Sequence, residues 1–109
     1  MKKWFALHTK PYSERKVAVR LEHNEIETFL PEIENNSKSS PTKRIPLFPG
    51  YLFMRLDLGA TNPAHWRTLP GVRYIVSYGD EPVPVREELI RLIAQQLEAL
   101  EMRKQQPNS

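Results

Sequence analysis

One segment, residues 44–56, constrains the fold more than any other part of the chain, because its backbone must bend within a run of aromatic and apolar residues. Pro46 and Pro49 cannot donate to a β-ladder, so they confine the first half of the segment to an edge strand or a bulge. Gly50 permits the unusual dihedral angles that a bend requires. We therefore expect a strand over residues 51–56, directly after the bend.

The predicted strand 51–56 is apolar on both faces. One face carries Tyr51, Phe53 and Arg55, and the other carries Leu52, Met54 and Leu56. A strand of this kind has a core on one side and needs cover on the other. The cover is either the protein's own helices or a binding partner, and periodicity alone leaves both readings open.

Length and composition indicate one soluble domain. The chain has 109 residues, of which 39% are hydrophobic and 27% are charged. No run of 18 or more apolar residues occurs, and the N-terminus leads directly into a strand-like segment, so we expect a cytoplasmic protein without a membrane segment. The absence of cysteine excludes disulfides. Residues 1–50 carry nine Lys and Arg against six Glu, so the basic excess lies in the first half.

The order of elements predicts an α+β fold, with an antiparallel sheet of about four strands flanked by helices. Strands are expected at residues 3–9, 25–31, 51–56 and 72–78, with a further extended piece from residue 83. Helices are expected at about residues 13–24, 63–69 and 86–102. The polar segment 35–42 has no apolar residue and is expected to be a mobile hairpin tip. Residues 1–101 would form the domain, and residues 102–109 a polar tail that begins a linker.

The first predicted helix combines an apolar arc with a basic stripe. The inward arc contains Val17, Ala18 and Leu21. The basic stripe contains Lys16, Arg20 and His23, spaced so that they share one face. The stripe is either a solvated helix face or a site for a few phosphate contacts. Lys38, Lys43 and Arg44, around the hairpin tip, allow the same two readings.

The last two predicted helices have clear signals. Asn62 and Pro63 supply an N-cap and a first-turn proline, and Trp66 and Leu69 should face inward. In the final helix, seven residues are expected to share one wide, mainly apolar face. It contains Val85, Leu89, Leu92, Ile93, Gln96, Leu97 and Leu100.

Nothing in the sequence indicates catalysis. His8, His23 and His65 lie on three different elements without metal-ligand spacing, and no nucleophile has a base at a recognisable distance along the chain. The four glycines are spread along the chain and form no phosphate-binding loop. We expect no enzyme activity, no metal, no cofactor and no small-molecule substrate.

Three motifs in order and spacing resemble the N-terminal domain of the NusG/RfaH family of transcription elongation factors. They are Trp-Phe-Ala-Leu at residues 4–7, Leu-Phe-Pro-Gly-Tyr-Leu-Phe at residues 47–53, and Pro-Gly-Val-Arg-Tyr-Ile-Val at residues 70–76. The resemblance extends from about residue 3 to about residue 100. It implies an α/β sandwich that acts in transcription elongation or antitermination, and most family members carry a further C-terminal KOW domain.

The resemblance also implies partners and site residues. The clamp helices of the largest RNA polymerase subunit would contact His8, Phe48, Pro49 and Tyr51, in a ring-lined concavity beside the Pro-Gly bend. The polymerase gate loop would meet Asn62, Pro63 and Ala64, where this chain lacks the His-Thr-Thr motif of RfaH-like proteins. The non-template DNA strand would contact Lys10, Lys16, Arg20 and His23. The bound domain would bridge the polymerase cleft and disfavour pausing.

A rival reading is a sheet-surface binder of single-stranded RNA. Residues 50–56 superficially resemble the RNP1 consensus of RRM domains, in which strand aromatics stack on bases. Pro49 replaces the expected Lys or Arg before the glycine, and the order of elements fits less well.

Overall fold

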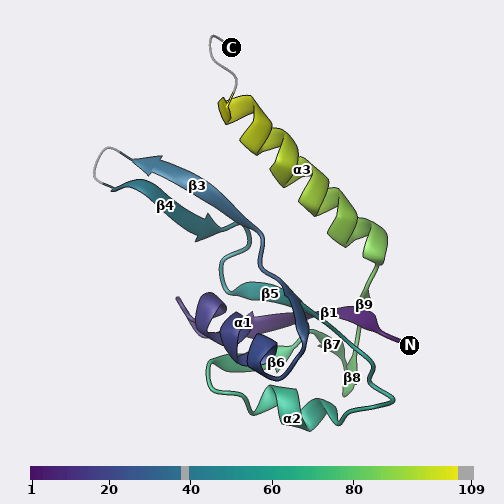
Figure 1. Cartoon of the computed structure of the whole chain (residues 1–109). Coiled ribbons are helices and arrows are strands. Elements are labelled where there is room, and N and C mark those ends of the chain that lie inside the picture. Colours follow the sequence, from purple (N-terminus) through teal and green to yellow (C-terminus); the bar gives the residue numbers. More distant parts are fainter. Residues whose placement is uncertain (38–39, 106–109) are drawn as a thin grey trace.

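The structure of the chain, a computed structural model, describes residues 1–37 and 40–105 (Figure 1). A central antiparallel sheet has the order β2–β5–β1–β6, and β9 pairs with the same edge of β1 as β6. Its strands are β1 (Lys3–Thr9), β2 (Glu27–Phe29), β5 (Tyr51–Leu56), β6 (Val72–Ile75) and β9 (Pro84–Val85). Two separate ribbons are β3 (Glu32–Ser37) with β4 (Ser40–Pro46), and β7 (Ser77–Tyr78) with β8 (Glu81–Pro82). The helices are α1 (Glu14–His23), α2 (Pro63–Arg67) and α3 (Glu87–Gln105). The predicted α+β fold is confirmed.

The alternation of β1 and β5 creates a core on each face of the sheet. The two strands pair antiparallel from Lys3 opposite Leu56 to His8 opposite Tyr51. One face packs against α1 and α2; its buried residues are Phe5, Leu7, Val17, Leu21, Leu52, Met54, Leu56, Trp66, Val72 and Ile75. The other face packs against α3; its buried residues are Trp4, Ala6, Phe53 and Ile90. Figure 1 shows α1 and α2 on one side of the sheet and α3 on the other.

Helix α1 packs as its sequence predicts, because Val17, Ala18 and Leu21 are buried against the sheet. Ser13 occupies the N-cap position, but its side chain makes no capping hydrogen bond and donates instead to the carbonyl of Pro11 at 3.4 Å. The chain crosses the helix closely at Gly71, where a Cβ atom would lie 2.9 Å from Cγ2 of Val17. Only glycine fits this approach and the positive φ of +93° without strain.

Helix α2 also follows its sequence signals. The side chain of Asn62 accepts a hydrogen bond from the backbone N–H of Ala64, as an N-cap should, and Pro63 begins the helix. Trp66 is buried, and its indole N–H donates to the hydroxyl of Thr61 at 3.2 Å. Leu69 packs partly buried against the same core.

The predicted apolar face of α3 is only partly buried. Val85 and Ile93 pack against the buried cluster, whereas Leu89, Leu92 and Leu100 are exposed. Ile90, which lies outside the predicted set, is the buried residue of the helix, because it packs with Trp4 and Phe53 of the sheet. The helix continues to Gln105, into the segment 102–109 that was expected to be a linker, and residues 106–109 lie outside the described residues.

Two strand predictions also need correction. Segment 35–42 is not a free tip, because β3 extends to Ser37 and β4 begins at Ser40; antiparallel backbone pairing stabilises these strands without apolar side chains. Lys38, at the tip, lies outside the described residues. The predicted strand 72–78 is interrupted at Val76, whose N–H donates to the carbonyl of Ala6 and whose carbonyl accepts from the N–H of Val83. The predicted strand 25–31 is shorter, as β2 covers only residues 27–29.

Candidate functional site

Four aromatic residues lie at the part of the sheet that α3 does not cover. We call these residues, His8, Phe48, Tyr51 and Tyr74, the aromatic face. His8 lies between Tyr51 of β5 and Tyr74 of β6, because these residues are its register partners on the two neighbouring strands. The ring centroids of His8 and Tyr51 are 4.7 Å apart, and those of His8 and Tyr74 are 4.8 Å apart. The strand pairing therefore brings residues from three parts of the sequence together.

The aromatic face is accessible to a partner. Phe48 is 40% exposed and Tyr74 is 47% exposed, and Pro49 beside them is exposed as well. Phe48 is held from beneath by an edge-to-face contact with Phe53, with ring centroids 6.2 Å apart. Since isolated domains rarely expose clustered aromatic rings without a reason, this face is the first candidate for a binding surface.

The rings of the aromatic face have polar edges that contact one another. A side-chain hydrogen bond with Tyr74, together with partial burial, raises the pKa of Tyr51. Nδ1 of His8 is buried and has no hydrogen-bond partner among the described residues. Aromatic rings with a polar edge suit a contact from which water is excluded.

The bend at residues 48–51 holds the aromatic face in place. Gly50 has a φ of +85°, its carbonyl accepts from the N–H of Thr9 at 2.8 Å, and a Cβ atom there would lie 3.4 Å from Nε2 of His8. The N–H of Gly50 donates to a carboxylate oxygen of Glu14 at 2.8 Å. Glu14 is only 7% exposed, and its carboxylate holds the bend in place through this buried hydrogen bond. Sequence reasoning missed Glu14 because a first-turn glutamate is ordinarily a surface residue.

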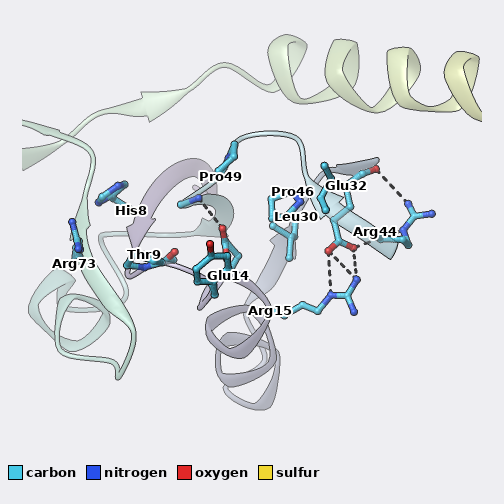
Figure 2. A pocket seen from close by; sticks show the side chains of 14 residues that line it. His8, Thr9, Glu14, Arg15, Leu30, Glu32, Arg44, Pro46, Pro49 and Arg73 are labelled. Carbon is cyan, nitrogen blue, oxygen red and sulfur yellow. Dashed lines mark hydrogen bonds and ion pairs between the residues drawn. The ribbon is translucent and has the colours of Figure 1, made fainter. Parts of the chain in front are cut away.

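A hollow of about 720 Å³ lies on the other side of the bend, between α1 and the base of the β3–β4 ribbon (Figure 2). It is lined by His8, Thr9, Pro11, Tyr12, Glu14, Arg15, Leu30, Glu32, Arg44, Ile45, Pro46, Pro49, Gly50 and Arg73. A hollow thus lies beside the Pro-Gly bend, but it is not the expected ring-lined concavity, because Phe48 and Tyr51 do not line it. The pleat of β5 sends Tyr51 to the face of the sheet that carries α3, where Phe48 also packs.

Charged side chains surround this hollow. Arg15 donates to both carboxylate oxygens of Glu32, with contacts of 2.9–3.1 Å, and Arg44 also pairs with Glu32 at 3.8 Å (Figure 2). Arg44 reaches Glu101 of α3 at 3.3 Å as well. Arg73 and Tyr74 were not among the predicted site residues, although both lie in the motif at residues 70–76. The β1 residues next to which they lie can be identified only when the strand register is known.

The predicted DNA-contacting residues lie on α1 or in the turn that precedes it. Lys16 and His23 are exposed on α1, and Lys10 is exposed just after β1. The Arg20 side chain already makes a contact within the domain, because its guanidinium donates to the carbonyl of Pro70 at 3.3 Å. Asn62 and Ala64 are exposed at the N-terminus of α2, so they form a third location instead of joining the aromatic face.

Within residues 1–37 and 40–105, no group of three or more His, Asp or Glu side chains is arranged to hold a metal ion. None of the helices there combines the length and the apolar character that crossing a bilayer requires.

The fold and its exposed surfaces define a small α+β domain with the features of a binding module. Residues 2–94 match the family model described as "Transcription termination factor nusG". The chain therefore belongs to the NusG family, which is a family of transcription factors and not of enzymes, and the resemblance read from the three motifs is confirmed.

Two relatives illustrate the match. The transcription termination/antitermination protein NusG of Thermus thermophilus is 30% identical to this chain over an alignment of 110 residues. The alignment covers 83% of this chain and 59% of that protein. A solved structure described as "Domain interaction in Thermotoga maritima NusG" superposes with a TM-score of 0.62 at 27% identity, over 92% of this chain and 59% of that chain. The present chain thus spans about 59% of the length of these relatives.

Proposed function

We propose that this domain binds RNA polymerase through its aromatic face and the non-template DNA strand through its basic side chains, and that it suppresses transcriptional pausing. The aromatic face left uncovered by α3 is the observation that carries the proposal. Membership of the NusG family supports a partner in the transcription machinery.

The polymerase contact is proposed for the clamp helices of the largest subunit. Phe48 and Tyr74 offer exposed rings. Phe48 lies in the bend that the buried Glu14 side chain holds at Gly50, and Tyr74 lies in strand β6. Aromatic anchors held rigidly in this way are typical of residues that dominate interface energies. His8, Phe48, Pro49 and Tyr51 would form the centre of the contact, and Asn62, Pro63 and Ala64 a second contact with the gate loop.

The DNA contact is proposed for Lys10, Lys16, Arg20 and His23. Lys16 and His23 are exposed on α1, and Lys10 is exposed in the turn that follows β1. A few phosphate contacts require only such a small cluster. With polymerase and DNA held on different sides, the domain would bridge the cleft, and it would bias the polymerase away from the paused state by its difference in affinity for the two states.

A pull-down with core RNA polymerase tests the first contact. Phe48→Ala should weaken binding by about 30-fold or more, the loss expected for a central aromatic anchor. Tyr78→Ala is the matched control, because Tyr78 is 87% exposed on the separate β7–β8 ribbon and its loss should leave binding unchanged. Equal binding by Phe48→Ala and wild type would refute the polymerase contact.

Crosslinking to the non-template strand in an elongation complex tests the second contact. Lys16→Glu should lower the crosslink yield while polymerase affinity stays nearly intact. Arg103→Glu makes the same charge change on exposed α3 and serves as the control. An unchanged crosslink for Lys16→Glu would remove the DNA assignment.

The rival RNA-binding reading loses its central residue in this fold. Phe53, which an RRM-like surface would use for stacking, is only 8% exposed beneath Phe48 and the residues packed with α3. Tight binding of single-stranded RNA by the domain, without affinity for polymerase, would nevertheless restore it.

A further inference from the structure

Tyr12 has an unfavourable backbone conformation with no compensating contact. It occupies the third position of the turn at residues 10–13, where the N–H of Ser13 donates to the carbonyl of Lys10 at 3.1 Å. Its φ is +60°, and a turn with proline second and a positive φ third normally takes glycine or asparagine there. The ring is 94% exposed and makes no hydrogen bond or ring contact with the described part of the chain. Packing of the fold does not explain a bulky side chain at this position.

The surroundings of Tyr12 are basic. Tyr12 lines the hollow beside the bend together with Arg73, and Lys10 belongs to the same turn. The two carboxylates of the hollow are already engaged, since Glu14 accepts from Gly50 and Glu32 is held by Arg15 and Arg44. Arg73 is exposed and forms no ion pair with a residue that the structure describes. An anionic ligand would therefore meet Lys10 and Arg73 beside an exposed ring.

We infer that Tyr12 stacks on an unpaired base of single-stranded DNA whose backbone phosphates contact Lys10 and Arg73. An exposed aromatic ring beside cationic side chains is the arrangement by which proteins hold single strands, because every base has a π-face. A paired base inside a duplex does not offer that face. The inference rests on the proposed DNA contact. It adds Tyr12 as a residue that contacts a base, in addition to the residues that contact phosphates.

Binding of the full chain to a fluorescein-labelled, mixed-sequence single-stranded DNA at low salt tests the inference. Asparagine tolerates a positive φ and lacks the ring, so Tyr12→Asn should weaken binding by about 5- to 150-fold, as loss of one stacked base does. Tyr12→Phe keeps the ring and should bind within roughly twofold of wild type. Tyr78→Asn removes another exposed tyrosine and should have no effect.

The salt dependence of DNA affinity distinguishes the contribution of stacking from the contribution of charge. Tyr12→Asn should leave the slope of log affinity against log salt concentration unchanged, whereas Lys10→Gln should reduce it by about 0.7. Duplex DNA should bind equally to Tyr12→Asn and wild type. Tyr12→Gly should raise the melting temperature, because glycine relieves the strain of the turn.

The outcomes distinguish the inference from the proposed function. Wild-type affinity of Tyr12→Asn, together with weaker binding by Lys10→Gln, would overturn the stacking role and leave the DNA contact standing. Failure of the wild-type chain to bind single-stranded DNA would overturn both. Loss of polymerase affinity in Tyr12→Asn, with DNA binding intact, would also overturn the inference by making the ring a protein contact.

Discussion

Phe48 shows how a single side chain connects folding with binding. Its ring rests edge-on against Phe53, yet 40% of its surface is exposed. Removing it should therefore cost about 1–2 kcal/mol of unfolding free energy, less than the 3–5 kcal/mol typical of a fully buried phenylalanine. Phe53→Ala is the matched comparison and should cost about 3–5 kcal/mol. Urea denaturation of both variants measures the difference; equal losses would mean that Phe48 is a core residue.

Asp57 gives the domain an acid-sensitive contact. Hydrogen bonds from the N-terminal ammonium group, at 2.9 Å, and from the N–H of Gly59 hold the pKa of Asp57 below its ordinary value of 3.8. Because the folded pKa is lowered, the stabilisation is complete above the unfolded pKa and is lost as the pH falls through the folded pKa. Asp57→Asn should lower the melting temperature at pH 6, and the difference from wild type should disappear as the pH falls through the lowered pKa of Asp57.

Melting curves between pH 2 and pH 7 provide the measurement for Asp57, at steps of roughly one unit. Asp80→Asn, in the exposed turn between β7 and β8, is the control and should leave the curve nearly unchanged. A constant difference between Asp57→Asn and wild type at all pH values would contradict the assignment.

At the scale of elements, Glu32 attaches the β3–β4 ribbon to the rest of the domain. Its carboxylate joins Arg15 of α1 and Arg44 of β4. Glu32→Gln should lower the unfolding free energy by about 1 kcal/mol, the upper end for exposed pairs, because the bond from Arg15 is bidentate. Amide hydrogen exchange should accelerate in β3 and β4 and stay unchanged in β1 and β5. The effect should shrink in 1 M salt, where the Debye length is about 3 Å.

Glu87→Gln is the matched control for the ribbon, because Glu87 pairs with Arg91 one turn away on exposed α3. It should cost only about 0.3–0.5 kcal/mol. Uniform acceleration of exchange across the sheet in Glu32→Gln would show global destabilisation and not release of the ribbon.

The elements also show which parts of the fold the sequence determines. Alternation in residues 3–9 and 51–56, and the Asn62-Pro63 start of α2, act locally, so they predicted β1, β5 and α2 correctly. The buried stripe of α3 depends on the shape of the sheet beneath it. The pairing of β3 with β4 depends on backbone hydrogen bonds that no side chain signals. The contacts of His8 with Tyr51 and Tyr74 required the strand register, which composition does not reveal.

At the scale of the whole molecule, the proposed polymerase and DNA surfaces lie on opposite faces of one sheet. Phe48 belongs to the face that carries α3, and Lys16 to the helix on the other face. Mutations at separate sites without shared contacts normally have additive effects. In binding to a complete elongation complex, the free-energy losses of Phe48→Ala and Lys16→Gln should add within about 0.5 kcal/mol.

A double-mutant cycle on the elongation complex measures this additivity. The double variant should lose the sum of the two single losses. An interaction energy well above about 0.5 kcal/mol would mean that the two surfaces communicate, and that the opposite-face arrangement does not describe how the domain engages its partners.

The buried carboxylate of Glu14 has a mechanical consequence. It accepts a hydrogen bond from the backbone N–H of Gly50, so a buried contact connects the first turn of α1 directly with the bend. The position of α1 is therefore coupled to the position of the bend that precedes β5. Held between two moving partners, the domain would act as a rigid spacer that fixes their separation.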